Sequence, residues 1–280
     1  MHGAPRLQQP GGLTPHPAYD GVQFRLAIGN TNEDVFTMTW RVPTRIPLPP
    51  DFIGFDPAES LPTPGFTSYE RHLPHWRIPG ACYFVTFRLD DSLPRKIEMD
   101  MRREKEAWQQ RLAQAAARHE GRLPPDETAA WEAFQRARLR KLEGLLDEGH
   151  GECLLRHPSD RECVQKALLH FEGTRSEMIA FVIMPNHVHL ACRPLAPHAL
   201  EELCASWKWF SAQQIQRRRA RVGSLWQEEN FDRLIRDAEH LTNVTRYIAR
   251  NPIKAALSED DACVWFSEDI HAANGWPSRP

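Results

Sequence analysis

The sequence predicts an α+β fold in which helices pack on one face of an antiparallel sheet. Three observations support this fold class. YFVTFRL (83–89) is β-branched and aromatic, as is typical of a strand. The apolar run 178–184 ends at a Pro-Asn turn, after which 187–192 returns as the second strand of a hairpin. Helical segments separate the first strand from this hairpin and also follow it.

Two helices are expected directly after the first strand. Residues 96–120 are highly charged and rich in Ala, Glu, Arg and Gln, which is typical of a helix. Pro124-Pro125 interrupts this pattern, and Asp126 can cap a second helix that runs to about residue 146. We expect the pair to form a helical hairpin inserted at about 96–148.

Three more helices are expected around and after the strand hairpin. The first begins at the capping box SDRE (159–162) and ends at Gly173. The second spans about 198–219. The third begins at Asp237 and ends at Asn251-Pro252, because proline disfavours continuation of a helix.

The domain boundaries follow from composition. Residues 1–66 are rich in Pro and Gly, and VPTRIPLPP (42–50) is typical of polyproline-like extended chain. We predict a loosely ordered N-terminal extension here, with short strands possible near 22–28 and 35–42. The folded domain is predicted at 67–257, and residues 258–280 are predicted to form a C-terminal tail.

The bulk composition is that of an ordinary globular protein. The chain has 280 residues, a formal net charge of −2 and 41% hydrophobic residues, so any nucleic-acid footprint must be local. The six cysteines form no Cys-x-x-Cys motif, which excludes a zinc knuckle or thioredoxin-type site and fits a reducing compartment. The start, MHGAPRLQQP, lacks the apolar core of a signal peptide, and the longest apolar run is too short to span a membrane. We expect a soluble, cytoplasmic protein.

Two histidines one residue apart open the second strand of the hairpin. Residues i and i+2 of a strand project to the same face, so His187 and His189 point together while Val188 and Leu190 point to the opposite layer. Two imidazoles on one face can hold one divalent ion. The alternative is a pair of polar side chains on the solvent face of an edge strand.

Tyrosine is scarce in this chain, with four residues, and one of them lies in the last helix. Tyr247 stands beside the apolar stripe of that helix, and Asn251 follows one turn later on the same face. The hydroxyl and the amide can therefore face one point in space. The alternative is an amphipathic helix with a half-buried tyrosine and an asparagine that only ends it. The stripe consists of Leu241, Val244 and Ile248.

A local basic and aromatic patch occupies 205–222, which contains no acidic residue. Cations beside aromatic rings suit single-stranded nucleic acid, because the charges contact phosphates and the rings stack on bases. The alternative is a solvated helix face whose tryptophans belong to the core. The cations are Lys208, Arg217, Arg218, Arg219 and Arg221, and the aromatic residues are Trp207, Trp209 and Phe210.

Five segments, in this order, resemble the REP-associated tyrosine transposases, a branch of the single-tyrosine HUH endonucleases, which are named for a His-hydrophobic-His motif. They are LPHWRIPGACYFVTFRLDDSLP (73–94), FVIMPNHVHL (181–190), WKWFSAQQI (207–215), LWQEENFDRLIRD (225–237) and RYIARNPIKAAL (246–257). MPNHVH and YIxxNPxKAxL are the specific pieces. The resemblance covers about 73–257, and neither the N-terminal extension nor the inserted hairpin contributes to it.

The resemblance implies a ferredoxin-like HUH fold and assigns roles within it. It implies that His187 and His189 bind a divalent metal, Mg²⁺ or Mn²⁺, and that Tyr247 is the nucleophile. Asn251 occupies the place of the third metal ligand, where related enzymes often carry Gln. No base for Tyr247 is identified, and His240 is one candidate.

The implied function is a metal-dependent endonuclease and strand transferase that acts through a 5′-phosphotyrosine intermediate. Its implied partner is single-stranded or hairpin DNA (REP-like palindromes), bound by a monomer or a homodimer. Two alternatives stay open. One is a domesticated, non-catalytic nucleic-acid-binding protein, and the other is a phosphodiesterase in which water attacks. The candidate DNA contacts are Trp207, Lys208, Arg217, Arg218, Arg219 and Arg221.

Overall fold

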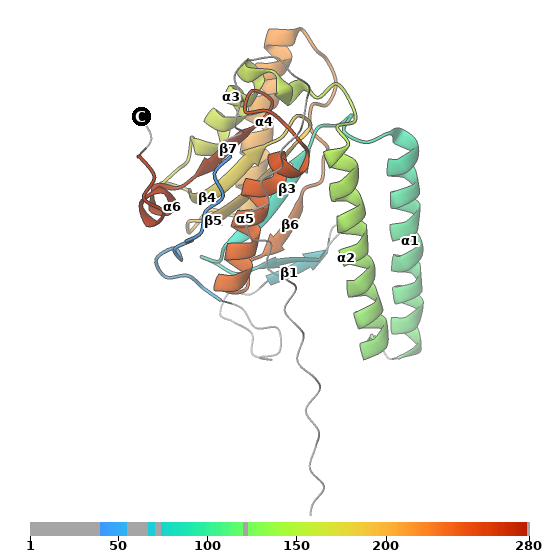
Figure 1. The fold of residues 1–280 in the computed structure, drawn as a ribbon. Helices are drawn as coiled ribbons and strands as arrows, with labels where there is room; N and C mark the ends of the chain where they lie inside the picture. The colour runs from blue at the N-terminus through green and yellow to red at the C-terminus, as the bar shows by residue number, and fades with distance from the viewer. Residues whose placement is uncertain (1–39, 55–66, 71–73, 120–122, 279–280) are drawn as a thin grey trace, which may run out of the picture. The chain divides into compact units, whose positions relative to one another are not determined.

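The structure is a computed structural model that describes residues 40–54, 67–70, 74–119 and 123–278 (Figure 1). Its centre is a five-stranded antiparallel sheet with the strand order β6-β3-β5-β4-β7, and β1 and β2 form a separate two-stranded sheet. The strands are β1 (Thr67–Glu70), β2 (Pro74–Arg77), β3 (Tyr83–Arg88), β4 (Ser176–Ile183), β5 (His187–Pro194), β6 (Phe231–Leu234) and β7 (Cys263–Phe266). The three predicted strands at 83–89, 178–184 and 187–192 are confirmed as β3, β4 and β5.

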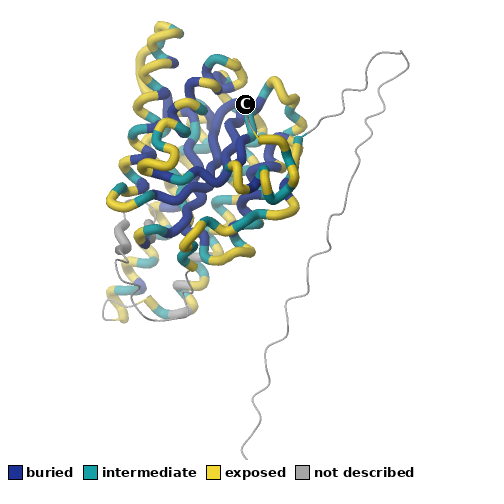
Figure 2. The backbone as a smooth tube through the Cα atoms, turned by 90° about the vertical axis from the view of Figure 1, so that its left-hand side faces the viewer, coloured by how far each residue is buried: buried dark blue, intermediate teal, exposed yellow. Residues whose placement is uncertain are grey.

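Helices cover both faces of this sheet, whereas the sequence analysis expected one covered face. The helices are α1 (Arg95–Arg118), α2 (Pro125–Asp147), the short 3₁₀ helix η1 (Leu154–Arg156), α3 (Pro158–Leu169), α4 (Leu200–Arg219), α5 (Ala238–Lys254) and α6 (Glu268–Ala273). Val188 and Leu190 of β5 join a core formed with α3 and α4, while Ala191 joins a second core formed with α5. Both faces of the central strands are apolar, so each must be covered to remove it from water. Figure 2 shows the buried residues gathered along the sheet.

The predicted hairpin of α1 and α2 is confirmed and stands beside the sheet (Figure 1). It has two small apolar clusters of its own, which explains why a highly charged segment forms a stable pair of helices. Near the sheet the cluster consists of Leu93, Met101 and Leu146. Along the helices three rings lie with centroids 5.1 to 6.2 Å apart, those of Trp108, Trp131 and Phe134.

The two ends of the hairpin insertion meet at a neck. The carboxylate of Asp91 accepts a hydrogen bond from the backbone N–H of Glu152 at 2.8 Å. Gly151 has a φ of +85°, and a Cβ at this position would lie 2.5 Å from the carbonyl oxygen of Asp91. Only glycine fits such a close approach in this conformation. The chain therefore leaves the sheet and returns to it at one place.

The ends of two helices differ from the expectation. The predicted capping box at 159–162 is wrong, because His157 is the N-cap of α3 and Pro158 takes the first helical position. Proline suits that position, because an N–H in the first turn would have no acceptor within the helix and its absence therefore costs no hydrogen bond. Asp237 caps α5 as predicted and accepts from the His240 N–H at 2.7 Å, but α5 continues through Pro252 to Lys254. A proline in the last turn removes only one helical hydrogen bond.

Both predicted domain boundaries need correction. Trp40, Val42, Ile46 and Phe52 pack against the core on the α5 side of the sheet, so part of the predicted extension at 1–66 belongs to the folded domain. β7 pairs with β4, so the predicted end at 257 is too early. The strand expected near 22–28 and residues 35–39 lie outside the described residues, and residues 40–42 form no strand. None of the described helices combines the length and the apolar character needed to cross a membrane.

Candidate active site

The two histidines lie at the centre of the sheet, under α5. β5 pairs with β3 on one side and β4 on the other, so it is not an edge strand. His187 is 0% exposed and His189 is 1% exposed, and their ring centroids lie 4.6 Å apart. The prediction that the two rings share one face is therefore confirmed, and the alternative of a solvent-facing edge strand is wrong.

Neighbouring side chains orient both imidazoles. His187 Nδ1 lies 2.7 Å from Asn186 Oδ1, which can only accept, so Nδ1 carries the hydrogen and Nε2 keeps its lone pair. His189 Nδ1 lies 2.7 Å from the hydroxyl of Thr86 on β3, which holds the second ring in place. Burial lowers the pKa of His187 to about 3 and that of His189 well below its ordinary value. Both rings are thus neutral near pH 7, the form that binds a metal.

Several polar atoms of this site are buried without a partner. His187 Nε2, Asn251 Oδ1 and Asn251 Nδ2 are inaccessible to solvent and form no hydrogen bond in the structure. Each buried polar atom without a partner lowers the stability of the folded state by about 1–3 kcal/mol. Two imidazole nitrogens and an amide oxygen are a reasonable donor set for a divalent ion. No cluster of three or more His, Cys, Asp or Glu side chains suits a metal within the described parts of the chain, so the Asn251 amide would complete the set.

Tyr247 places its hydroxyl beside the second histidine. Its oxygen lies 3.3 Å from His189 Nε2, and the ring meets those of His189 and Phe84 at centroid distances of 5.2 and 5.9 Å. Burial raises the pKa of Tyr247 well above its ordinary value, and the negative charge of Glu143 raises it further. The nearby amide of Asn251 lowers it. A phenol in this environment stays protonated until another group takes its proton.

The inserted hairpin contributes to this site, which the sequence analysis did not anticipate. Glu143 of α2 lies close enough to Tyr247 for the two groups to shift each other's pKa; burial raises the pKa of Glu143, and its interaction with Tyr247 lowers it. One turn later, Asp147 Oδ2 pairs with Lys254 Nζ of α5 at 2.6 Å. Nothing in the sequence distinguishes these two acids from the other charges of α2. His240 lies about 10 Å from Tyr247 along α5, and its Nδ1 accepts from the Arg236 N–H at 3.2 Å.

Two predicted DNA contacts have other partners in the structure. Trp207 is 1% exposed and belongs to the core, so its predicted stacking on a base is wrong. Trp209 and Phe210 are the aromatic side chains of α4 that lie in solvent, at 66% and 41% exposure. Lys208 Nζ donates to three oxygens, the carbonyls of Gln227 and Glu228 and the side chain of Asn230. Lys208 therefore fixes the segment 227–230 rather than presenting a free charge.

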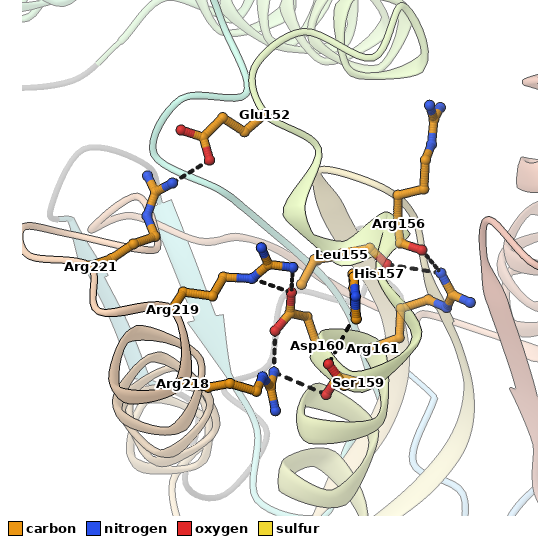
Figure 3. A network of polar contacts seen from close by, with 10 residues as sticks. All are labelled: Glu152, Leu155, Arg156, His157, Ser159, Asp160, Arg161, Arg218, Arg219 and Arg221. Atoms are coloured by element: carbon orange, nitrogen blue, oxygen red, sulfur yellow. Dashed lines mark hydrogen bonds and ion pairs between the residues drawn. The ribbon is translucent and has the colours of Figure 1, made fainter.

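The arginines at the end of α4 form ion pairs with acids from elsewhere in the fold. Figure 3 shows Asp160 of α3 between Arg218 and Arg219, with Arg219 Nε 2.7 Å from Asp160 Oδ2. Arg221 pairs with Glu152, while Arg217 is exposed. Arg77 pairs with Asp232 at 2.6 Å, which explains the acid in the FDR segment. DNA contacts by the four arginines stay a prediction.

Asp160→Asn is expected to destabilise the protein by about 2 kcal/mol, because the change leaves two guanidinium groups without their buried partner. The Asp160 side chain is 0% exposed, but those of Arg218 and Arg219 are 41% and 30% exposed and can be partly rehydrated. Urea unfolding measures the loss. Glu162→Gln, which breaks an exposed pair with Lys166 on the same helix, is the control and should lower the free energy of unfolding far less. Equal losses in the two variants would contradict this role of Asp160.

Comparison with known proteins identifies part of the chain. Residues 159–251 match the family model described as "Transposase IS200 like". A solved structure, "Structure of the REP associates tyrosine transposase bound to a REP hairpin", is similar at 16% identity over 67% of this chain and 73% of that chain, with a TM-score of 0.37. No curated protein matches. The matched segment contains His187, His189, Tyr247 and Asn251 but not the inserted hairpin. Residues 159–251 of the chain are thus similar to the IS200-like transposases.

Proposed function

We propose that the protein nicks and rejoins single-stranded or hairpin DNA through a covalent bond between Tyr247 and the 5′ phosphate. One observation carries the proposal. The Tyr247 hydroxyl lies 3.3 Å from His189 Nε2, at a buried site where His187 and Asn251 keep unpaired polar atoms. A half-buried tyrosine of structural value alone leaves those unpaired atoms unexplained.

The chemistry exchanges one phosphodiester bond for another. Tyr247 Oη attacks the phosphorus, the bond from phosphorus to the 3′ oxygen breaks, and that oxygen leaves as a 3′ hydroxyl after gaining a proton. A 3′ hydroxyl of the same or another strand then attacks the phosphotyrosine, which restores the DNA bond and frees the tyrosine. A Mg²⁺ or Mn²⁺ held by His187, His189 and Asn251 would neutralise phosphate charge and stabilise the leaving oxygen.

Glu143 is the group that takes the phenolic proton. Its carboxylate lies close enough to Tyr247 for each group to shift the pKa of the other, and a general base must be near the proton that it removes. His189 Nε2 has one lone pair and cannot both accept from Tyr247 and ligate a metal. Of the other groups that act on the hydroxyl, Asn251 is an amide that cannot take a proton near neutral pH, and Asp147 is paired with Lys254, which leaves the carboxylate of Glu143.

Glu143→Gln is expected to slow formation of the protein–DNA bond by about a hundredfold, because an amide cannot take the proton. A base acts in its deprotonated form. The rate of the unmodified protein should therefore rise with pH through the raised pKa of Glu143 and level off above it. The variant should lose this rise while still binding DNA. Glu148→Gln, an exposed acid just beyond α2, is the control. An unchanged pH profile in Glu143→Gln would remove Glu143 from the mechanism.

The direct test uses hairpin oligonucleotides taken from the DNA that flanks the gene. They are labelled at the 3′ end, because the fragment that becomes attached to tyrosine keeps that end. The protein is incubated with them and Mn²⁺, and the products are separated on a denaturing gel. A labelled band at the size of the protein, lost with chelator, is the expected result. Cleavage without that band would indicate attack by water, and a native-gel shift without cleavage would indicate a DNA-binding protein without this activity.

A further inference from the structure

A cavity of about 310 Å³ lies between the inserted hairpin and the sheet, beside the candidate active site. Its walls come from α1, α2, β3 and the segment 227–231. Thr86 is among the lining residues, and its hydroxyl also contacts His189 at 2.7 Å. The cavity therefore begins one side chain away from the histidine pair. Lys208 of α4 holds the wall at 227–230 in place through its three hydrogen bonds.

Two cations that line this cavity have no ion pair among the residues that the structure describes. Lys105 of α1 is 5% exposed and forms no hydrogen bond or ion pair with any residue that the structure describes. Arg138 of α2 has a buried Nε without a partner, and its guanidinium forms no ion pair in the same described residues. The two other cations of the lining differ. Arg88 pairs with Glu98 at 2.8 Å, and Arg102 pairs with Glu106 at 3.2 Å.

This arrangement is unfavourable for the protein alone. Buried charges are normally paired, because removing a charge from water is costly. Burial lowers the pKa of Lys105 and that of Arg138, and the charge of Arg138 further lowers that of Lys105. The charge of Glu229 offsets part of this effect for both groups. The lining also contains four acids, of which Glu98 and Glu106 are paired with arginines, and the others are Glu228 and Glu229. An external anion between Lys105 and Arg138 would supply the partner that these two cations lack.

We propose that this cavity binds a phosphate group of the DNA strand next to the phosphate at which Tyr247 reacts. A phosphate supplies several acceptor oxygens, which suit the Lys105 ammonium and the free Nε of Arg138. The volume is at the lower end of the range for small-ligand sites, about 300–1,000 Å³, and leaves room for a nucleotide around that phosphate. This inference rests on the proposed function. It gives the hairpin a role in holding substrate, in addition to the contact of Glu143 with Tyr247.

The first test measures DNA binding in full-length protein that carries Tyr247→Phe, so that no chemistry follows. Binding of the flanking hairpin oligonucleotide is measured by fluorescence anisotropy from 50 to 300 mM NaCl. Lys105→Met and Arg138→Met should each weaken binding by on the order of tenfold. The slope of log affinity against log salt should become shallower by about 0.7 for one lost phosphate contact. Without DNA, the variants should melt at the same temperature as the parent or higher, since an unpaired buried charge has been removed.

Control variants and inorganic phosphate distinguish a DNA-phosphate site from a site for free anions and from a purely structural role of Lys105. Arg103→Met and Lys141→Met remove exposed, paired cations that lie on the same two helices but outside the cavity lining, and they should leave the salt slope unchanged. Inorganic phosphate, compared with chloride at equal ionic strength, should raise the melting temperature of the parent but not that of Lys105→Met. If phosphate stabilises the parent and the DNA slope does not change, the cavity binds free anions and the assignment to DNA is overturned. If Lys105→Met lowers the melting temperature and phosphate has no effect, Lys105 is structural and the proposal fails. The phosphate result does not depend on whether the protein cleaves DNA.

Discussion

Tyr247→Phe is expected to abolish the covalent protein–DNA product, with a loss of more than about a thousandfold, while DNA binding is retained. The substitution removes one oxygen, which is the atom that attacks phosphorus in the proposed reaction. The ring keeps its contacts with Phe84 and His189, so the fold should not change. The 3′-labelled hairpin assay on a denaturing gel measures the product, and anisotropy measures binding.

The matched control for this result is Tyr83→Phe. The Tyr83 hydroxyl accepts from the Ile78 N–H at 2.8 Å and contacts the Ile78 carbonyl at 3.1 Å, so its role is structural. Its loss should cost about 1 kcal/mol of stability and leave the covalent product in place. A covalent product that persisted in Tyr247→Phe, and disappeared in Tyr83→Phe, would show that the nucleophile has been assigned to the wrong residue.

His187→Gln and His189→Gln are expected to remove Mn²⁺ binding and to slow cleavage by at least about a hundredfold. Each change deletes one of the two nitrogens that the site offers, in a region where few other donors are available. Titration calorimetry with Mn²⁺ measures binding separately from activity. Thr86→Val should have a smaller effect, about 10- to 100-fold in metal affinity, because it removes only the partner that orients His189.

His240→Gln provides the control for the histidine variants. His240 is a partly buried histidine of α5, the helix that carries Tyr247 and Asn251, but it bonds to the backbone of Arg236. Its loss should leave Mn²⁺ binding unchanged. Undiminished Mn²⁺ binding in His187→Gln would mean that the unpaired Nε2 of His187 serves some other purpose, and the ligand set would have to be revised.

Local patterns were sufficient where a strict period or a cap decides the structure. The two-residue period of a strand placed His187 and His189 on one face, and the four-residue spacing of a helix placed Asn251 near Tyr247. The burial of Trp207 could also have been predicted. Leu200, Leu203 and Cys204 precede it, and Ser211 and Ile215 follow it, at the spacing of a buried helix face.

Other features depend on contacts between distant parts of the chain and left no local signal. β6 and β7 have four residues each, and their pairing with β3 and β4 defines them more than their own composition does. The second covered face of the sheet follows from the packing of α5. Glu143 lies more than a hundred positions from Tyr247 in sequence. Its place depends on how the hairpin stands beside the sheet, which no helical pattern specifies.

The neck at Asp91, Gly151 and Glu152 makes the hairpin an insertion that can be exchanged as a unit. Since the inserted chain leaves and returns at one closed point, its length can change without shifting the register of the strand that carries the histidines. Evolution or an engineer can therefore exchange the part that contributes Glu143, Lys105 and Arg138 while the histidine pair and the tyrosine stay in place. Under the proposed function, replacing this single segment would change which part of the DNA the protein contacts.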